Sequence, residues 1–423
     1  MPTPATGVVV DAYTTGNLLP AAFAAHGVRL VHVQAAPTVS TALPPPDLTR
    51  FTENIVHDGE TTLARLRALG PAFVIAGQDS GVALADRLSE ALGLPTNGTA
   101  LSPARWDKYA TGERLGACGL RRALQFRSGD PADLVRWRKE NAPETDFPVV
   151  VKPLSSAGTD RVRLCHSDEE IEAAARAVLS GPDVYGKPNT EVLIQSYLAG
   201  TEYIVDTVSR DGAHLVCGVW RYHKRLVAGR PVYDRDVLLD PAEEPVPALV
   251  AYIRRVLDAV GVRHGSAHAE VIVTPHGPAL VEIGQRMNGN MHPGMHQRAL
   301  GHDQAALTAL AYLRPEEFRA RHAGRVYTRH RPAMVCNAAT ERSGTVTGID
   351  PAAVARIEAL PGVHAVAVKL ATGDRMRPTT DLLSSPLRVF LTHDDPRVLD
   401  AGADAVRALA DTVYALAPGE DRP

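Results

Sequence analysis

The first hundred residues alternate short β-branched runs with helical segments, and this alternation constrains the fold more than any other feature of the chain. Strand-like runs occur at residues 7–11, 28–33 and 72–76, and segments with helical signals separate them. Strands and helices that alternate in this way form a parallel sheet with covering helices. Ligands bind beyond the carboxyl ends of such strands, so the loops at residues 13–17 and 78–80 are candidate ligand loops.

The rest of the chain predicts an α+β organisation. Residues 102–118 begin with a serine N-cap and a proline, and residues 167–179 begin with a Ser-x-x-Glu capping box, so both segments are expected to be helices. Strand-like runs joined by hairpin turns follow between residues 192 and 283. The last segment, residues 396–414, is expected to be a helix capped by Asp395.

Composition excludes several classes of protein. The formal net charge of -3 argues against a nucleic-acid binder, which would carry a basic stripe. Four cysteines lack zinc-ligand spacing and are too few for a disulfide scaffold, so reduced thiols are expected. The N-terminus lacks the basic region of a signal peptide, and no apolar run is long enough to span a membrane. These features predict a cytoplasmic protein.

Two glutamates in strand patterns, followed by an arginine, form the strongest candidate site. Glu270 and Glu282 each lie between apolar residues, and Arg286 follows the second by four positions. A hairpin would place both carboxylates on one face, where like charges are costly unless a cation lies between them. The pattern is typical of Mg²⁺ held against nucleotide phosphates, with the arginine neutralising developing charge. A structural salt bridge to Arg286 is the alternative.

A second candidate site precedes it. Residues 146–152 are expected to form a strand that ends at Lys152, and the small residues Ser155, Ser156 and Gly158 follow. Small residues let backbone N–H groups approach phosphate oxygens, and the lysine adds positive charge. The order of residues is not that of a P-loop. A strand that ends in a polar hairpin is the alternative.

Three further segments carry polar side chains that a ligand could use. Residues 192–202 form an apolar strand, a polar link and Glu202, which suits an adenine edge and ribose hydroxyls but also an ordinary strand connection. His223 and Lys224 form a basic cluster that contacts either phosphate, a substrate carboxylate or solvent. Lys108, taken alone, is expected to be a surface lysine. The histidines at positions His264, His268, His292, His296 and His302 lack HExxH spacing, so a zinc centre is not expected and most are expected to be surface or packing residues.

The order of these parts resembles the ATP-grasp superfamily. The parts are a lysine on a helix, a strand with lysine and a small loop, an adenine-linker-like segment, a first glutamate and Glu-x-x-x-Arg. The chain looks most similar to bacterial L-amino acid ligases, which join two amino acids into a dipeptide. The segments that support this resemblance are residues 8–16, 94–98, 203–209 and 220–224. It extends from Gly7 to Val406.

The resemblance implies an ATP-grasp fold, which combines α/β and α+β parts. Residues 1–100 would form an N-terminal parallel α/β domain of the pre-ATP-grasp type. Residues 101–190 would form the ATP-grasp lid subdomain, and residues 191–329 the core subdomain with the metal site. Residues 330–423 would form a small C-terminal α+β subdomain. A homodimer is also a family-level expectation.

The resemblance also assigns roles to individual residues. The residues expected to bind ATP are Lys108, Lys152, Ser155, Ser156, Gly158, Gln195, Tyr197, Leu198 and Glu202. Glu270 and Glu282 would bind Mg²⁺, with Mn²⁺ as an alternative, and Arg286 would steady the acyl phosphate. His223 is the candidate general base. The candidate substrate contacts are Tyr222, Lys224, Asn288 and Asn290.

Two positions depart from the family pattern. The superfamily commonly has Glu-x-Asn, and this chain has Gly284 in place of the asparagine. A third metal ligand is therefore either missing or supplied from elsewhere, such as Asn288. The adenine linker usually begins with glutamate, and here it begins with Gln195. A carboxamide oxygen can still accept a hydrogen bond from the adenine amino group, so ATP binding is expected to survive.

The resemblance implies an ATP-dependent carboxylate–amine ligase. Such an enzyme would form a peptide bond between two small-molecule amino acids through an acyl phosphate and release ADP and phosphate. One alternative is an ATP-grasp ligase of natural-product biosynthesis that joins a carboxylic acid to an amine other than an amino acid. The other alternative is a non-catalytic nucleotide-binding regulator. Neither nucleic acid nor a membrane is an expected partner.

Overall fold

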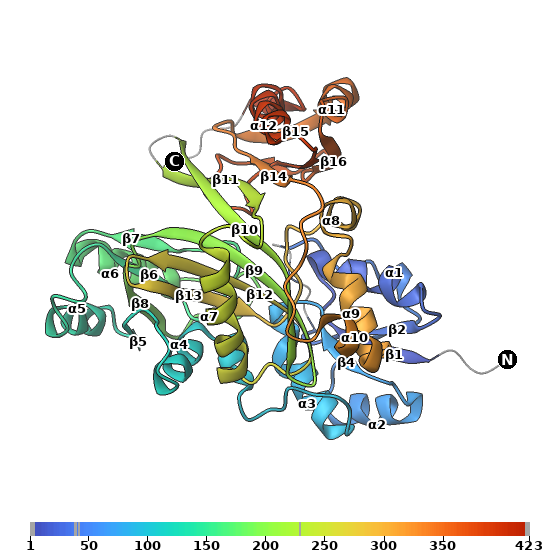
Figure 1. Cartoon of the computed structure of the whole chain (residues 1–423). Coiled ribbons are helices and arrows are strands. Elements are labelled where there is room, and N and C mark those ends of the chain that lie inside the picture. The colour runs from blue at the N-terminus through green and yellow to red at the C-terminus, as the bar shows by residue number, and fades with distance from the viewer. Residues whose placement is uncertain (1–4, 38–39, 41–42, 228–229, 419–423) are drawn as a thin grey trace. The chain divides into compact units, whose positions relative to one another are not determined.

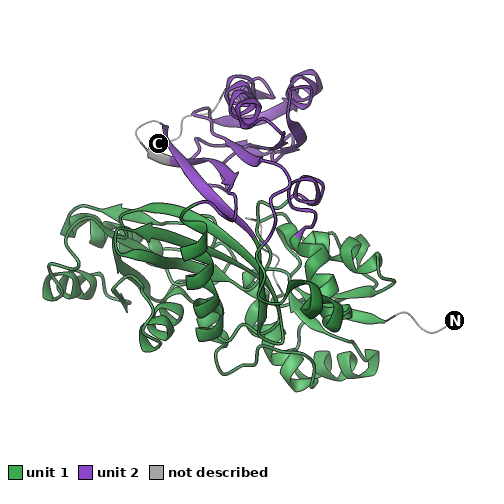
Figure 2. Cartoon of the chain, viewed as in Figure 1, with its two compact units in different colours: residues 1–217, 244–291, 304–326 green, residues 218–243, 292–303, 327–423 purple. Residues whose placement is uncertain are grey.

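The computed structural model describes residues 5–37, 40, 43–227 and 230–418, and the chain divides into two compact units (Figure 1, Figure 2). The first unit comprises Met1–Cys217, Glu244–Met291 and Gln304–Val326. The second unit comprises Gly218–Glu243, His292–Asp303 and Tyr327–Pro423. The division into four domains that the sequence suggests stays a prediction.

The first unit begins with the parallel sheet that the alternating sequence predicts. Its strands, in the order β3-β2-β1-β4, are β3 (Asn54–Val56), β2 (Arg29–Gln34), β1 (Thr6–Val10) and β4 (Val74–Ala76). Its helices are α1 (Leu19–Ala24), α2 (Glu60–Leu69) and α3 (Val82–Ala91). Val8, Val9 and Val10 are all fully buried, because helices cover both faces of a parallel sheet.

A four-stranded antiparallel sheet follows in the same unit. Its strands, in the order β5-β8-β6-β7, are β5 (Gln125–Ser128), β8 (Val192–Ser196), β6 (Val149–Pro153) and β7 (Arg163–Cys165). Helices α5 (Pro131–Glu140) and α6 (Asp168–Leu179) pack against each other beside it (Figure 1). The Ser167 hydroxyl accepts a hydrogen bond from Glu170 N, as the predicted N-cap requires.

The remaining strands of the first unit form an antiparallel arrangement, in the order β13-β12-β9-β10. They are β13 (Gly277–Gly284), β12 (Gly265–Thr274), β9 (Thr201–Arg210) and the first part of β10 (Ala213–Val227). The helices of this region are α4 (Lys108–Ala117), α7 (Val246–Ala259), α9 (Gln304–Leu313) and α10 (Pro315–His322). The chain passes into the second unit along β10.

The second unit continues from β10 through strands in the order β10-β11-β14-β18-β16. They are β11 (Arg230–Leu238), β14 (Ala333–Ala338), β18 (Leu387–Thr392) and β16 (Val363–Val368). Its helices are α8 (Pro293–Leu300), α11 (Pro351–Glu358) and α12 (Pro396–Ala410). A small sheet has the order β17 (Arg375–Met376), β15 (Gly344–Ile349) and β19 (Tyr414–Pro418).

Two predicted helices are shorter than the sequence suggested. The segment 102–118 divides into a 3₁₀ turn, Ser102–Arg105, and α4, because Asp107 is extended and its carboxylate caps α4 through Ala110 N at 2.7 Å. The last helix, α12, ends at Ala410. The chain then forms β19, and Val413 and Tyr414 are buried in the core of the second unit.

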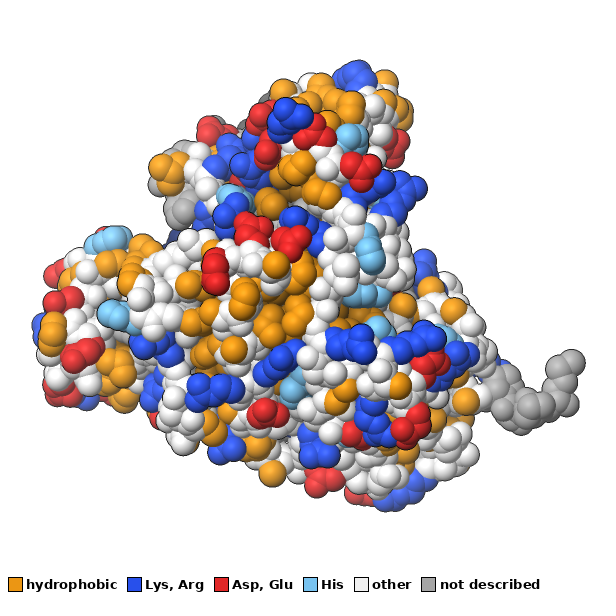
Figure 3. Space-filling view, viewed as in Figure 1, with side chains coloured by type: hydrophobic (Ala, Val, Ile, Leu, Met, Phe, Trp, Pro, Cys, Tyr) orange, Lys and Arg blue, Asp and Glu red, His pale blue; other side chains and the backbone are white. Residues whose placement is uncertain are grey.

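Charged side chains of both signs are interspersed on the face that Figure 3 shows. This mixture agrees with the small net charge of -3. Among the described residues, no helix has both the length and the apolar character needed to cross a membrane.

A buried ion pair ties three segments of the first unit together. The Arg105 side chain is fully buried, and its Nη2 donates to Asp86 Oδ2 on α3 at 2.8 Å. Its Nη1 donates to the carbonyl of Val260, after α7, at 3.0 Å. A guanidinium out of contact with water depends on these acceptors, because its desolvation is costly.

We predict that Asp86→Ala destabilises the protein strongly, because it leaves the buried Arg105 charge without a counter-charge. The expected loss is about 3–5 kcal/mol in the free energy of unfolding. The matched control is Glu172→Ala, which removes one side of an exposed pair with Arg176 and should cost about 1 kcal/mol or less. Urea denaturation followed by circular dichroism measures both. Equal losses in the two variants would contradict the prediction.

Candidate active site

Glu270 and Glu282 lie opposite each other across the β12–β13 hairpin. The two residues are register partners, with a bulge directly after Glu270. Directly opposed residues of an antiparallel pair share a face, and the neighbours Ala269, Val271 and Ile283 are buried on the other face. The carboxylates are only partly exposed, at 15% and 23%. The arrangement of two acids on one face therefore agrees with the pattern in the sequence.

Lys108 supplies a cation to this pair. It is the first residue of α4, and its Nζ lies 3.0 Å from Glu282 Oε2. Burial disfavours its charge, but Glu282, Asp79 and Glu270 outweigh burial and raise the pKa of Lys108. A residue that resembles a surface lysine in the sequence is thus a charged and mostly buried part of the site.

Lys152 on β6 is a second, more deeply buried cation. Its side chain is almost fully enclosed, and burial together with the charge of Lys108 lowers the pKa of Lys152 to about 8, although Glu282 and Glu202 favour the charge. Burial opposes the charge of Glu282, yet Lys108 and Lys152 outweigh it and lower the pKa of that carboxyl. Lys108, Lys152 and Glu282 therefore form one group of interacting charges.

The small-residue loop after β6 is hydrogen-bonded to this group of charges through Lys108. Ser155, Ser156 and Gly158 are half-buried, and Lys108 Nζ donates to the Ser156 carbonyl at 2.8 Å. The backbone is left-handed at Gly158, Thr159 and Arg161, with φ values of 66°, 64° and 49°. Left-handed residues other than glycine are strained and gather at ligand-binding loops. The loop thus has the backbone conformation typical of a ligand clamp.

Arg286 is held by a carboxylate from the N-terminal sheet. Its Nε donates to Asp79 Oδ2 at 2.8 Å, and its Nη1 donates to the Met287 carbonyl at 2.9 Å. The Tyr185 hydroxyl lies 3.4 Å from the same oxygen of Asp79. Burial works against the guanidinium charge, but Asp79 outweighs it and raises the pKa of Arg286. Asp79 lies in the loop at residues 78–80, which the sequence marks as a ligand loop, but its pairing with Arg286 was not anticipated.

The Asp79 carboxylate also explains Gly284. A Cβ atom at position 284 would lie 2.3 Å from Asp79 Oδ1, which is far closer than van der Waals contact. Asp79 Oδ1 is itself buried and has no hydrogen-bond partner among the residues that the structure describes. The place where the family pattern suggests an asparagine is therefore adjacent to an acid from another part of the chain.

A buried polar chain supports Glu270. His268 Nδ1 lies 2.9 Å from Asp206 Oδ1, and His268 Nε2 lies 3.8 Å from Glu270 Oε1. Burial disfavours the imidazolium, but Asp206 and Glu270 raise the pKa of His268 to about 9. Asn288 Nδ2 donates to Asp206 at 2.9 Å, and Asn288 Oδ1 accepts from Asn290 N at 2.8 Å. His268 is thus buried in a hydrogen-bonded chain, and its nearness to Asp206 is visible only in the folded sheet.

The expected adenine segment leaves β8 and leads into β9. Gln195 Nε2 donates to Gln125 Oε1 at 3.1 Å, which orients the Gln195 carboxamide. Tyr197 is 47% exposed, Leu198 is half-buried and Glu202 is buried. Glu202 is close enough to Lys152 to favour its charge. The adenine segment therefore comes close to Lys152 at Glu202.

Three predicted site residues belong to the second unit. His223 Nε2 accepts from Arg221 Nε at 3.0 Å, and burial and Arg221 lower the pKa of His223. The Tyr222 ring meets Tyr233 edge-on at 4.6 Å, and Lys224 Nζ lies 4.4 Å from the Tyr233 ring centre. The roles of these residues in catalysis and substrate binding stay predictions.

The site offers two carboxylates to a metal ion. Within the described part of the chain, no group of three or more His, Cys, Asp or Glu side chains is arranged to hold a metal. Mg²⁺ commonly takes one or two carboxylates and completes its coordination with water and substrate phosphates. Glu270 and Glu282, which face each other beside two lysines, fit that mode of binding.

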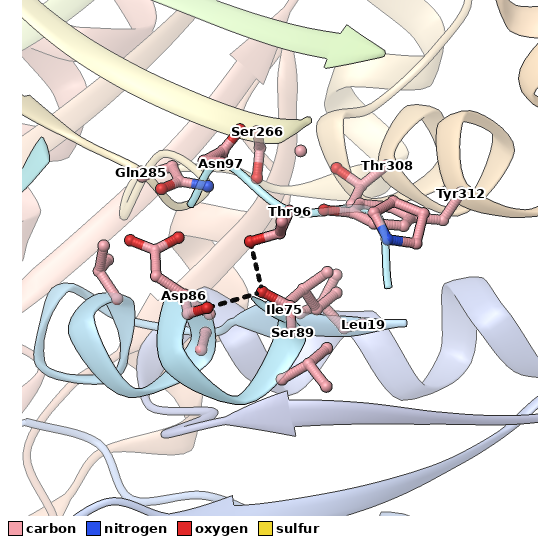
Figure 4. A pocket seen from close by; sticks show the side chains of 16 residues that line it. Leu19, Ile75, Asp86, Ser89, Thr96, Asn97, Ser266, Gln285, Thr308 and Tyr312 are labelled. Carbon is pink, nitrogen blue, oxygen red and sulfur yellow. Dashed lines mark hydrogen bonds between the residues drawn. The ribbon is translucent and has the colours of Figure 1, made fainter. Parts of the chain in front are cut away.

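A small polar cavity is lined in part by residues of β4, α3 and the start of β12 (Figure 4). Its volume of about 20 Å³ is enough for about one water molecule. In its lining, the Ser89 hydroxyl bonds with the Asp86 carbonyl and with the Thr96 hydroxyl. The buried Gln285 Oε1 lacks a hydrogen-bond partner among the described residues. The cavity is too small for a substrate.

The chain is similar to several known proteins. Residues 145–293 match a family model described as an ATP-grasp domain. Dapdiamide A synthase of Enterobacter agglomerans is 34% identical over 418 residues, which cover 97% of this chain and 96% of that protein. The crystal structure of an L-amino acid ligase from Bacillus licheniformis has a TM-score of 0.75 at 17% identity and covers 99% of this chain and 100% of its own.

A further similar structure contains a nucleotide. It is the carboxyaminoimidazole ribonucleotide synthase of Aspergillus clavatus complexed with ATP. Its TM-score is 0.69 at 13% identity, with coverage of 97% of this chain and 99% of that one. At such identities, the two crystal structures show a shared fold.

We predict that Gly284→Ala disturbs the site without unfolding the protein. The added methyl group would displace the Asp79 carboxylate and, through it, Arg286. Because Arg286 is expected to steady the acyl phosphate, nucleotide-dependent turnover should fall about tenfold or more when it is displaced. Steady-state kinetics and the melting temperature measure the two effects. The control is Gly348→Ala, where a Cβ meets nothing within 4 Å. Unchanged turnover in Gly284→Ala would contradict the steric argument.

Proposed function

This chain belongs to the ATP-grasp family and is an ATP-dependent carboxylate–amine ligase, and from that premise we propose that it joins two amino acids through an acyl phosphate. The observation that carries the proposal is the convergence of Lys108 and Lys152 on Glu282, opposite Glu270. The names of the relatives agree with it, because one makes dapdiamide A and another ligates L-amino acids.

In this proposal the nucleotide lies between the lysine pair and the segment after β8. Lys108 and Lys152 bind its phosphates, and the loop from Ser155 to Gly158 covers them. The segment from Gln195 to Leu198 holds adenine, and Glu202 accepts from the ribose hydroxyls. The buried position of Glu202 near Lys152 supports this order of contacts.

Glu270 and Glu282 would hold Mg²⁺, and Mn²⁺ is an alternative. When bound, the ion would neutralise phosphate charge as a Lewis acid. His268 orients Glu270, Asp206 fixes His268 in turn, and Asn288 donates to Asp206. Partners of this kind, outside the ligands themselves, commonly decide the affinity of a metal site.

The reaction has two steps. A carboxylate oxygen of the first substrate attacks the γ-phosphorus, and the bond to the bridging oxygen of ADP breaks. The amine nitrogen of the second substrate then attacks the acyl carbon, phosphate leaves as its bond to that carbon breaks, and the proton from the nitrogen passes to the departing phosphate. Lys152 and Arg286 stabilise the negative charge that develops in each step. Asp79 holds the Arg286 guanidinium in place for this role.

An alternative second substrate is an amine other than an amino acid, as in natural-product biosynthesis. The masses of the products decide between the two. The hypothesis of a non-catalytic regulator is set aside, because the chain belongs to a family of ligases.

We predict that wild-type protein releases ADP with pairs of amino acids and not with single ones, and that Glu282→Gln abolishes this release. Loss of the carboxylate removes both a metal ligand and the partner of Lys108, so the rate should fall about 100-fold or more. A coupled ADP assay and mass spectrometry of the products measure it. Glu60→Gln, at the exposed start of α2, is the matched control. Full activity of Glu282→Gln would contradict the assignment of Glu282 as a metal ligand.

We predict that nucleotide affinity weakens as the pH rises above about 8. The pKa of Lys152 is lowered to about 8, so its ammonium is charged below that pH and loses its charge above it. The phosphates prefer the charged form, so the dissociation constant should rise up to about tenfold per pH unit above this value.

Lys152→Arg provides the test, because a guanidinium stays charged over this range. Calorimetric titration of a non-hydrolysable ATP analogue between pH 7 and 9.5 should give a flatter profile for the variant than for wild type. Lys139→Arg, at an exposed position, should keep the wild-type profile. A wild-type profile in Lys152→Arg would show that another group is responsible.

A further inference from the structure

A larger cavity opens at the carboxyl edge of the N-terminal parallel sheet, and we call it the sheet-edge cavity. Its volume of about 290 Å³ is close to the lower end of small-molecule sites, which measure about 300–1,000 Å³. The residues that matter for its chemistry are Asp11, Tyr13, Arg87, Trp106, Tyr185 and Lys187. All of them belong to the first unit.

The cavity lies where the topology of the sheet favours a ligand. The strand order β3-β2-β1-β4 changes direction between β1 and β4, and open parallel sheets bind ligands at such points. Asp11 follows β1, and Ser80 follows β4. Asp11 Oδ2 accepts from Ser80 Oγ at 2.6 Å, and Asp11 Oδ1 accepts from Ala35 N at 2.8 Å. These bonds fix the three loops that form the wall.

The backbone of this wall is strained. Asp11 and Thr14 adopt left-handed conformations, with φ values of 53° and 51°. Such conformations in residues other than glycine cost about 1–3 kcal/mol each and are found mainly at functional sites. A wall whose Asp11 is held in a strained and hydrogen-bonded position is preorganised for a ligand.

Tyr185 lies between the cavity and the Asp79–Arg286 pair. This side chain lines the cavity, and its hydroxyl lies 3.4 Å from Asp79 Oδ2, the oxygen that binds Arg286. Burial raises the pKa of Tyr185 well above its usual value, so the hydroxyl stays protonated. A ligand in the cavity therefore lies one side chain away from the Asp79–Arg286 pair.

The polar groups of the cavity that lack partners are donors. Arg87 and Lys187 form no ion pair among the residues that the structure describes, and Lys187 Nζ lies 5.9 Å from the centre of the Trp106 ring. Trp106 Nε1 is buried and has no hydrogen-bond partner in that part of the chain. Tyr13, Trp106 and Tyr185 provide aromatic walls. The cavity is therefore complementary to a small ligand that bears an anion and hydrogen-bond acceptors.

We propose that the sheet-edge cavity binds the far end of the acid substrate, and that this acid carries a second carboxylate remote from the reacting one. The proposal rests on the proposed function. Cations lie on both sides of Tyr185, with Arg286 on the side of Asp79 and with Arg87 and Lys187 in the lining of the cavity. Trp106 Nε1 donates a hydrogen bond to the part of the substrate between the carboxylates or to the second carboxylate itself.

The test compares diacids with their monoamides. Calorimetry in the presence of a non-hydrolysable ATP analogue measures the binding of glutamate against glutamine and of succinate against succinamate. The diacid should bind about tenfold more tightly, since hydrogen bonds to charged groups have that magnitude. Arg87→Gln and Lys187→Gln should each reduce the preference at least threefold, and Trp106→Phe should weaken both ligands. Arg67→Gln, an exposed cation on α2 outside the cavity, should change nothing.

Three outcomes would overturn the proposal. They are equal binding of diacid and monoamide by wild type, an unchanged preference in Arg87→Gln and Lys187→Gln, and a stronger preference for a phosphate ester of similar length. The binding measurement needs no turnover, so it separates this proposal from the proposed function. If no acid and amine release ADP while the diacid preference persists, the ligase reaction fails and the anion site stands.

Discussion

The buried pair of Arg286 and Asp79 is the interaction on which the rest of the site depends. It joins the loop after β13 to the carboxyl edge of the N-terminal sheet, across 207 positions of sequence. Removing one partner would leave an uncompensated buried charge, which costs several kcal/mol. Gly284 leaves room for the carboxylate, and Tyr185 contacts the same oxygen. The N-terminal sheet and the β12–β13 hairpin are therefore coupled through one ion pair.

Features with a local period could be predicted from the sequence. Alternating strands and helices predicted the parallel sheet, and the pattern around Glu270 and Glu282 predicted two acids on one face of a hairpin. Such predictions succeed because side-chain direction alternates with a period of two in a strand. The order of the lysines, glutamates and arginine along the chain was also enough to indicate the family, which the similarity to known proteins confirms.

Features that depend on distant contacts could not be predicted. Asp79 and Tyr185 meet Arg286 only after folding, and the role of Asp206 beside His268 depends on the register of β9 and β12. Gly284 appeared to be the loss of a ligand, whereas in the structure a neighbouring carboxylate needs the space. The helix expected over residues 102–118 begins only at Lys108, because Asp107 caps it in the middle of a segment whose pattern favours one continuous helix.

The contact between Lys108 and Glu282 has a thermodynamic consequence. Each group neutralises the other at 3.0 Å, so an anion that draws Lys108 away leaves Glu282 in need of another cation. Binding of an anion and binding of a cation must then favour each other, and the coupling free energy is the same whichever binds first. In the proposed function, a nucleotide and a metal ion would therefore replace this internal pair together, and neither would gain its full affinity alone.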